Sequence, residues 1–340
     1  MITLLGQTQA ELVALAADMG QPAFRGRQIC EWVYKHHAET IDAMSSLSKS
    51  LREQMAADCT TGRSAPVECA ESPDGTKKYL FPAGEGKFIE TALIPDEERA
   101  TLCISTQVGC ARACAFCATG QQGLQGNLSA AEILNQYASC PERDQITNVV
   151  YMGMGEPLDN LEAVLRSVEI FTADYGYAKS PTRLTVSTVG ILPALETLIK
   201  SCSCHVAISM HSPFGEERAA MMPVEKQHPI KEVVELLRRA AIRGQRRLTF
   251  EYALFDGLND SPAHAKAVAR LLKDLVCRIN LIPFNAVPGS SYVPSPREKV
   301  EAFQDILKDA GFVTTIRKSK GQDISAACGM LSTARLKGLG

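Results

Sequence analysis

The sequence lacks any long hydrophobic run. No stretch of about 18 uncharged apolar residues appears, which argues against a membrane-spanning helix. The first twenty residues also lack the basic start, the apolar core and the small-residue cleavage site of a signal peptide. Charge imbalance is small, because 36 Lys and Arg stand against 38 Asp and Glu. We therefore expect a soluble cytoplasmic protein, with no membrane partner, in which any basic surface is local.

The composition leaves little room for disorder. Hydrophobic residues make up 45% of the 340 residues and charged residues 22%, which is enough apolar material for a sizeable core. A chain of this length suits one large domain with a small one beside it. Twelve cysteines in a protein expected inside the cell are more often thiols, metal ligands or catalytic groups than a disulfide framework.

Two kinds of pattern divide the chain. Residues 1–60 carry helical periodicity, and residues 61–98 carry short β-like runs around the turn signal Asp74-Gly75. From residue 99 strands and helices alternate, which predicts parallel β/α units. The predicted strands cover residues 101–107, 146–152, 183–188, 205–210, 247–255, 277–283 and 312–317.

These patterns predict an α/β fold with a partial (β/α) barrel. We expect four parts: an N-terminal helical accessory domain, a β-hairpin linker region, the partial barrel and a C-terminal segment. Their predicted bounds are 1–60, 61–98, 99–318 and 319–340. An open doubly wound sheet has the same sequence pattern, so the closure of the barrel stays open at this point. In a β/α barrel the chemistry collects on the loops that follow the strands, and here GCARACAFC, GMGEP, ISMHS, FNAVPG and SKGQDISAACG follow predicted strands.

The run CARACAFC places Cys110, Cys114 and Cys117 four and then three residues apart. Three buried thiols on a helix are one reading of this spacing. A zinc site completed by Cys103 or Cys140 is a second reading, although no second cysteine pair lies nearby in the sequence. A four-iron cluster is the third: thiolates suit iron–sulfur clusters, and three of them leave one iron open to an external ligand.

The third reading agrees with a family resemblance. Cys-x3-Cys-x2-Cys with Phe116 before the last cysteine, placed after a first barrel strand, resembles the radical S-adenosylmethionine (SAM) superfamily. The chain is also similar to the RlmN/Cfr family of RNA adenosine methyltransferases over most of residues 85–330, and FRGRQICEWVY resembles that family's accessory domain. The similar blocks are ERATLCISTQVGCARACAFCATGQQGLQGNLSAAEI, NVVYMGMGEPLDN, RLTVSTVGILPAL, ISMHSPFGEERAAMMPV, NLIPFNAVPG and IRKSKGQDISAACG.

The resemblance implies a role for each reactive residue. Cys110, Cys114 and Cys117 match the ligands of a [4Fe-4S] cluster. Cys328 matches the cysteine that takes a methyl group from one SAM, and a second SAM then yields the radical that joins this methyl carbon to adenine. Glu90 matches the acceptor of the ring proton. Cys103 matches the cysteine that forms a disulfide with Cys328 and releases the RNA, so the family uses two SAM per turnover.

The resemblance also implies binding partners. The positions that match SAM-binding residues are Gly155, Glu156, Ser187, Ser209, Met210, His211 and Asn285. Family substrates are 23S rRNA and tRNA, and an external reductant such as a flavodoxin-type donor is expected, with the protein acting as a monomer. Local basic patches support an RNA partner, among them the group Arg238, Arg239, Arg243, Arg246 and Arg247.

Two questions remain open at the level of sequence. GEPL and NLIPFNAVPG favour RlmN-type methylation at C2 of adenosine 2503 in rRNA and adenosine 37 in tRNAs, whereas CATG and HSPFGEER lean toward Cfr-type methylation at C8. A non-enzymatic RNA-binding or redox-sensing protein with a metal cluster is the alternative of a different class. Such a protein would have no use for Cys103, Cys328 and MGMGEP together.

Overall fold

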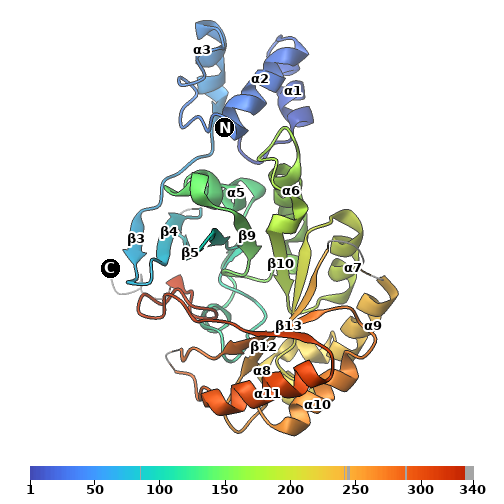
Figure 1. Cartoon of the computed structure of the whole chain (residues 1–340). Helices are drawn as coiled ribbons and strands as arrows, with labels where there is room; N and C mark the ends of the chain where they lie inside the picture. The colour runs from blue at the N-terminus through green and yellow to red at the C-terminus, as the bar shows by residue number, and fades with distance from the viewer. Residues whose placement is uncertain (85, 241, 243–245, 288, 334–340) are drawn as a thin grey trace.

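The computed structural model describes residues 1–84, 86–240, 242, 246–287 and 289–333. Its main feature is a ten-stranded sheet in the order β14-β13-β12-β11-β10-β9-β6-β5-β4-β3. Helices lie on the outer side of the strands, and three further helices stand apart at the N-terminal end of the molecule (Figure 1). No described helix is both long and apolar enough to span a bilayer.

The N-terminal helices form where the sequence places their signals. They are α1 (Gln9–Asp18), α2 (Ala23–Tyr34) and α3 (Lys49–Asp58). Thr8 and Glu11 form a capping box that satisfies the first amides of α1, and Gly20 takes a positive φ of 71° just after that helix. Strands β1 (Ile2–Thr3) and β2 (Cys59–Thr60) pair in parallel and bring the two ends of this region together.

Seven strands of the large sheet are parallel neighbours, as the alternating pattern predicts. They are β6 (Arg99–Cys103), β9 (Asn148–Tyr151), β10 (Leu184–Thr188), β11 (His205–Ser209), β12 (Leu248–Leu254), β13 (Arg278–Pro283) and β14 (Val313–Ile316). Within the described residues β14 pairs with β13 alone, so the barrel is partial rather than closed. The predicted α/β fold class with a partial barrel is confirmed.

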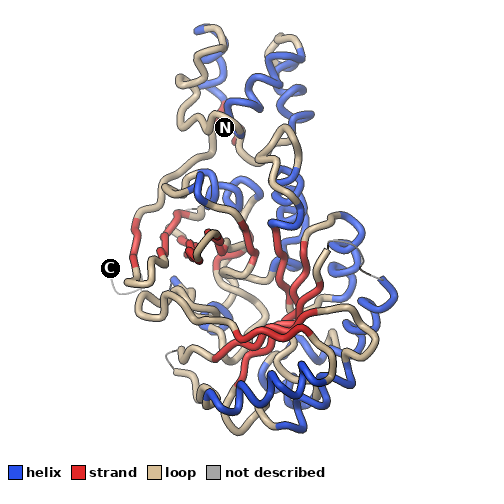
Figure 2. Tube along the Cα trace, in the orientation of Figure 1, coloured by secondary structure: helices blue, strands red, loops and turns tan. Residues whose placement is uncertain are grey.

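Amphipathic helices cover the outer face of this curved sheet (Figure 2). In α9 the buried side chains Ile230, Val233, Val234 and Leu237 form the stripe that the sequence predicts. The sequence also predicts that this helix ends at Gly244, and that residue lies outside the described residues. The covering helices are α6 (Leu161–Thr172), α7 (Leu192–Ser201), α9 (Ile230–Ala240), α10 (Pro262–Leu271) and α11 (Arg297–Asp309).

Residues 61–98 extend the same sheet. Strands β3 (Glu68–Glu71), β4 (Lys77–Pro82) and β5 (Phe88–Asp96) are antiparallel neighbours, and β5 pairs antiparallel with β6. The expected boundary at residue 98 therefore falls in the short connection between two paired strands. The red C-terminal segment lies beside these strands in Figure 1.

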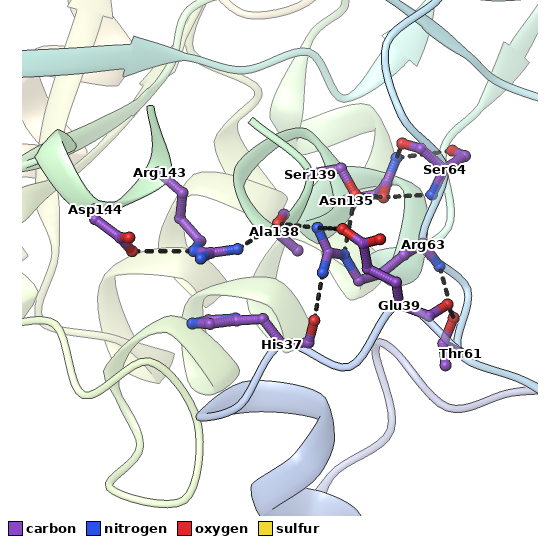
Figure 3. A network of polar contacts seen from close by, with 10 residues as sticks. All are labelled: His37, Glu39, Thr61, Arg63, Ser64, Asn135, Ala138, Ser139, Arg143 and Asp144. Carbon is purple, nitrogen blue, oxygen red and sulfur yellow. Dashed lines mark hydrogen bonds and ion pairs between the residues drawn. The ribbon is translucent and has the colours of Figure 1, made fainter. Parts of the chain in front are cut away.

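One arginine joins the accessory helices to the barrel. The Arg63 guanidinium donates to the carbonyls of His37 and Ala138 and to the Ser139 hydroxyl (Figure 3). His37 follows the accessory helix α2, whereas Ala138 and Ser139 end α5 (Ala130–Ala138) beside the barrel. The side chain of Asn135 also holds the backbone of Ser64 on both sides, so the connecting segment is fixed at two adjacent residues.

Candidate active site

A cavity opens at the carboxyl ends of the parallel strands, where the barrel prediction places the chemistry. All three cysteines of the Cys-x3-Cys-x2-Cys run and Cys328 line it, although Cys328 lies more than two hundred residues away in sequence. The remaining predicted residues that line the cavity are Gly155, Glu156, Ser187, Ser209, His211 and Asn285. The structure therefore gathers segments from the whole barrel and the C-terminal segment around one space.

The cysteine loop reaches the cavity through two tight backbone positions. Gly109 has a φ of 75°, and a Cβ there would lie 1.8 Å from the carbonyl oxygen of Gly123, so only glycine fits. Ala113 also has a positive φ, of 50°, which turns the chain between the first two cysteines. The amide of Ala115 donates to the carbonyl of Met221. Residues 110–117 therefore form turns and no helix. The prediction that the three cysteines are buried thiols on a helix is wrong.

The three thiols have the chemistry of an iron–sulfur ligand set. Burial raises the pKa of Cys110 to about 12 and also raises the pKa values of Cys114 and Cys117, and the negative charges of neighbouring cysteines add to the effect. A cationic metal centre would offset both penalties. Among the described residues no group of three Cys, His, Asp or Glu side chains is arranged around a single metal ion. The fit to a cluster therefore rests on the donor set and on its shared cavity.

The loop after β9 forms the opposite wall of the cavity. A Cβ on Gly153 would lie 2.7 Å from the Ile104 carbonyl oxygen, and one on Gly155 would lie 2.6 Å from the Gln107 side chain. These glycines are thus required by the packing of this loop against the segment after β6, a reason that the motif alone does not reveal. Glu156 is buried, and its two carboxylate oxygens accept from the amides of Leu158 and Val189.

Burial controls the charge of two further side chains in the cavity. Burial raises the pKa of Glu156 to about 7, against the hydrogen bonds that lower it. Burial also lowers the pKa of His211 to about 3, so its ring is neutral at physiological pH. His211 Nδ1 accepts from the Ala253 amide, which leaves the ring proton on Nε2. Phe116 packs edge-to-face on this ring and fixes its orientation.

A carboxylate that the sequence analysis missed also lines the cavity. Glu251 lies in β12, where its Oε1 accepts from Asn280. Its Oε2 is buried and has no hydrogen-bond partner among the described residues, and the Arg317 guanidinium is 3.9 Å away. An unsatisfied carboxylate oxygen suits a cationic ligand such as SAM. The available signal was a charged residue inside the apolar strand run RLTFEYALF.

The C-terminal segment is tied down on both sides of Cys328. On one side, Gly321 donates its amide to Asp74 Oδ2 at 2.9 Å, and Ser72 donates to Asp323 at 2.6 Å. On the other side, the carbonyl of Gly329 accepts from Ala118, the first residue of α4 (Ala118–Gln122). Hydrogen bonds therefore anchor the chain before Cys328 to the β3–β4 turn, and the chain after Cys328 to the end of the cysteine loop.

Cys103 lies behind Cys328 rather than in the wall of the cavity. It is buried at the end of β6 and packs with Ala92 and Ala326. Burial raises its pKa to about 12, and the negative charge of Cys328 raises it further, while Arg317 opposes the shift. Attraction to Cys328 is also the main reason that the pKa of Arg317 is raised. Arg317 therefore lies close to both predicted reactive cysteines.

Besides Cys103, two further predicted residues lie outside the wall of the cavity. Met210 is completely buried, and its backbone bonds to Glu251 and Arg218. Glu90 lies on β5, where Oε2 accepts from the Ser332 amide at 2.8 Å. Oε1 of Glu90 pairs with Lys78 Nζ, a partner that the sequence analysis missed because the two residues meet only through strand pairing.

Comparison with known proteins places this arrangement in a family. The Radical SAM superfamily matches residues 104–268, and the ribosomal RNA large subunit methyltransferase N-terminal domain matches residues 2–60. A probable dual-specificity RNA methyltransferase RlmN from Bacteroides thetaiotaomicron is 52% identical over 98% of this chain and 96% of its own length. The corresponding protein of Porphyromonas gingivalis W83 is 50% identical over 98% of this chain and 97% of its own length.

A solved structure agrees over the same length. The crystal structure of a radical SAM methyltransferase from Sphaerobacter thermophilus superposes with a TM-score of 0.92 at 41% identity. It covers 97% of this chain and 99% of its own chain. With a relative more than half identical over nearly the full length, the chain belongs to the RlmN family of the radical SAM superfamily.

Proposed function

We propose that this protein is a SAM-dependent methyltransferase that methylates C2 of adenosine in RNA. The observation that carries the proposal is the cavity shared by Cys328 and the three cysteines of the Cys-x3-Cys-x2-Cys run. The names of its relatives, which are RNA methyltransferases of RlmN type, support the substrate class. The proposed substrates are adenosine 2503 of 23S rRNA and adenosine 37 of tRNAs.

Cys110, Cys114 and Cys117 would hold a [4Fe-4S] cluster with one iron open to the amino and carboxylate groups of SAM. When bound, the cluster supplies the electron that makes a radical from SAM, which is the chemistry needed to functionalise an unreactive ring carbon. Glu251 faces the same cavity with an unsatisfied oxygen and would balance a positive charge of SAM. His211, a neutral Nε2–H donor, would orient a polar group of the ligand.

Cys328 would act as the methyl carrier. Its thiolate would attack the methyl carbon of one SAM, so that a new S–C bond forms and S-adenosylhomocysteine leaves. Arg317 lies close to this sulfur, because the charge of Cys328 is the main cause that raises the Arg317 pKa. One hydrogen atom of this methyl group would pass to the 5′-deoxyadenosyl radical of the second SAM, and the resulting methylene carbon would bond to the adenine ring. The electron that the ring gives up would pass to the cluster, and protein and RNA would then be covalently joined.

Glu90 and Cys103 would complete the reaction. The Glu90 carboxylate takes the ring proton, and Lys78 keeps that carboxylate in position. The Cys103 thiolate would then attack the sulfur of Cys328 and form a Cys103–Cys328 disulfide as the bond from that sulfur to the adenine-bound carbon breaks. The freed carbon keeps the bonding electron pair and takes up one proton, which completes the methyl group. An external thiol reductant must restore both thiols before the next cycle, which would use two SAM in total. A flavodoxin-type donor is proposed as the source of electrons for the cluster, and a monomer as the working form.

Product analysis tests the proposal. The protein, reconstituted anaerobically with iron and sulfide, should bind about four irons per chain and release 5′-deoxyadenosine when given SAM and a reductant. Digested product RNA should contain 2-methyladenosine. Finding only 8-methyladenosine would replace C2 by C8 methylation of Cfr type, and finding no methylated adenosine with 5′-deoxyadenosine still formed would contradict the proposed RNA substrate.

A further inference from the structure

The opposite rim of the barrel carries a second hollow that no step above uses. Its volume is about 970 Å³, and its lining contains five arginines but neither Asp nor Glu. We call it the arginine hollow and define it by Arg99, Arg183, Arg246, Arg247 and Arg278, with His205 beside them. The active-site cavity lies at the carboxyl ends of the strands, whereas this hollow lies at their amino ends.

Strand topology explains why the charges gather there. Arg99 and Arg278 begin β6 and β13, Arg183 directly precedes β10, and Arg247 directly precedes β12. Parallel strands begin at the same edge of a sheet, so residues at equivalent positions of separate strands become neighbours. The five arginines come from separate parts of the sequence. Only Arg246 and Arg247 belong to the basic group that the sequence analysis named, and Arg243 of that group lies outside the described residues.

None of these five arginines forms an ion pair with a carboxylate of the described residues. The arginine ion pairs that the structure describes involve other residues. Four of the five side chains are exposed, and Arg246 is half-buried because it donates to the carbonyls of Cys204 and Ile199. The pKa of His205 is lowered, first by burial and then by Arg247, Arg246 and Arg278, which confirms that these three charges act on one place.

Such a concentration of guanidinium groups costs electrostatic repulsion and is expected to have a ligand of opposite charge. Arginine presents forked donors that match phosphate oxygens. A hollow of this size is too large for a single phosphate ion and lies within the range of nucleotide-sized sites. The strands separate it from the active-site cavity by roughly 20 Å, since five to seven residues rise by about 3.3 Å each. An electron donor for the cluster would have no reason to bind at this rim.

We propose that the arginine hollow binds phosphate groups, and that in the working enzyme these belong to the RNA substrate at a distance from the methylated adenosine. This assignment rests on the proposed RNA methylation. An RNA that reaches around the barrel would be held at two rims, so binding energy from remote phosphates would help to position the target base. A free nucleoside polyphosphate would offer the same chemistry and is distinguished by the test.

The test compares wild-type protein with the double variant Arg247→Gln/Arg278→Gln. Both side chains are exposed and make no side-chain hydrogen bond in the described structure, so the fold should be retained. The matched control is Arg297→Gln, an exposed arginine of α11 paired with Glu301. The probes are a tRNA transcript, the isolated anticodon stem-loop of the same tRNA, ATP and inorganic tripolyphosphate.

We expect the double variant to bind the full tRNA about 10-fold or more weakly, with the salt dependence of log K reduced by about one per arginine removed. Affinity for the short stem-loop, and its methylation rate, should stay unchanged because that RNA cannot reach the other rim. If wild type binds ATP or tripolyphosphate saturably and the double variant does not, while tRNA affinity is equal, the ligand is a free polyphosphate.

Equal binding of every probe by wild type, the double variant and the control would overturn the assignment. Failure of the proposed function gives a different result. In that case neither RNA would be methylated by the wild type, whereas tripolyphosphate binding, measured by calorimetry, would still report on the arginine hollow.

Discussion

Lys78 Nζ lies 2.8 Å from Glu90 Oε1 across the paired strands β4 and β5, and both side chains are about nine-tenths buried. The other oxygen of Glu90 accepts from the Ser332 amide. The carboxylate is therefore held from the sheet on one side and from the C-terminal segment on the other. Because Lys78 and the Ser332 amide each occupy one oxygen of this carboxylate, Glu90 can accept a proton from the adenine ring only through the lone pairs that these two partners leave free.

Substitutions at this pair should slow proton removal. Glu90→Gln should lower the methylation rate by about 10²- to 10⁴-fold, the usual contribution of a general base. Lys78→Met should lower kcat by about 10-fold or more with little change in KM, because it releases the carboxylate without touching the RNA. In both variants Cys328 should still receive its methyl group from SAM at the wild-type rate, as measured by mass spectrometry of the protein.

The conservative variant Lys78→Arg should recover part of the lost rate, and the exposed substitution Lys266→Met on α10 serves as the control. Loss of Cys328 methylation in Lys78→Met would mean that Lys78 acts on the fold of the site rather than on Glu90.

Acid should release the segment that carries Cys328. Burial raises the pKa of Asp74, but hydrogen bonds from Thr76, from the Gly321 amide and from Ser72 outweigh it and lower the pKa to about 2. A carboxyl group with a depressed pKa stabilises the fold above its ordinary value near 3.8, and this contribution is lost as the pH falls toward 2. Hydrogen exchange of the Gly321 amide, corrected for the intrinsic pH dependence of exchange, should therefore quicken over this interval in wild type.

At pH 7, Asp74→Asn should make alkylation of Cys328 faster than in wild type, because the Asn side-chain amide is a weaker acceptor for the Gly321 amide. Glu71→Gln, at an exposed residue of the same hairpin, is the control. An alkylation rate of Asp74→Asn equal to that of wild type at pH 7 would show that Ser72 and the α4 contacts hold the segment without Asp74.

The parts of this structure that depend on local pattern were predictable, and the parts that depend on pairing were not. Alternating strands and helices predicted the parallel β/α units and placed the motif loops at one edge of the sheet, but an open doubly wound sheet has the same pattern, so the closure of the sheet was left open. The contact of Lys78 with Glu90 and the anchoring of Gly321 by Asp74 require the register of strands and a segment about 250 residues away. A glycine at position 153 could serve either close approach of a ligand or close packing against the backbone. The sequence does not distinguish these two reasons, and the structure shows the packing against Ile104.

Arg63 should control how the accessory helices present RNA to the barrel. Arg63→Met removes the donors of two carbonyl groups and of the Ser139 hydroxyl, and each unsatisfied buried acceptor costs about 1–3 kcal/mol. We expect faster proteolysis within residues 60–67 and a higher KM for RNA, with unchanged iron content and unchanged 5′-deoxyadenosine formation in the absence of RNA.

The control is Glu39→Gln, since this exposed carboxylate lies 3.7 Å from Arg63 and an exposed ion pair contributes little. If Arg63→Met kept the wild-type KM while proteolysis increased, the position of the accessory helices would not limit RNA binding.

The two cysteines near Arg317 should give opposite phenotypes when they are replaced. Cys328→Ala should retain about four irons per chain and bind SAM but form no covalent bond with RNA, because the methyl carrier is absent. Cys103→Ala should accept the methyl group and attach to RNA but fail to release it, so a protein–RNA species should accumulate on a denaturing gel. Cys69→Ala, at an exposed free cysteine of β3, is the control and should behave as wild type.

The asymmetry follows from where the two sulfurs lie. Cys328 lines the cavity in which the substrate would bind, whereas Cys103 is buried outside that wall and the charge of Cys328 raises its pKa. A disulfide between them needs Cα atoms about 4.4–6.8 Å apart, which the packing of Cys103 against Ala326 makes attainable with a small movement of the C-terminal segment. Because burial raises the Cys103 pKa to about 12, its attack should quicken as pH rises from 7 to 9. Release of RNA that is insensitive to pH over this range, or normal turnover of Cys103→Ala, would assign the resolving step to another thiol.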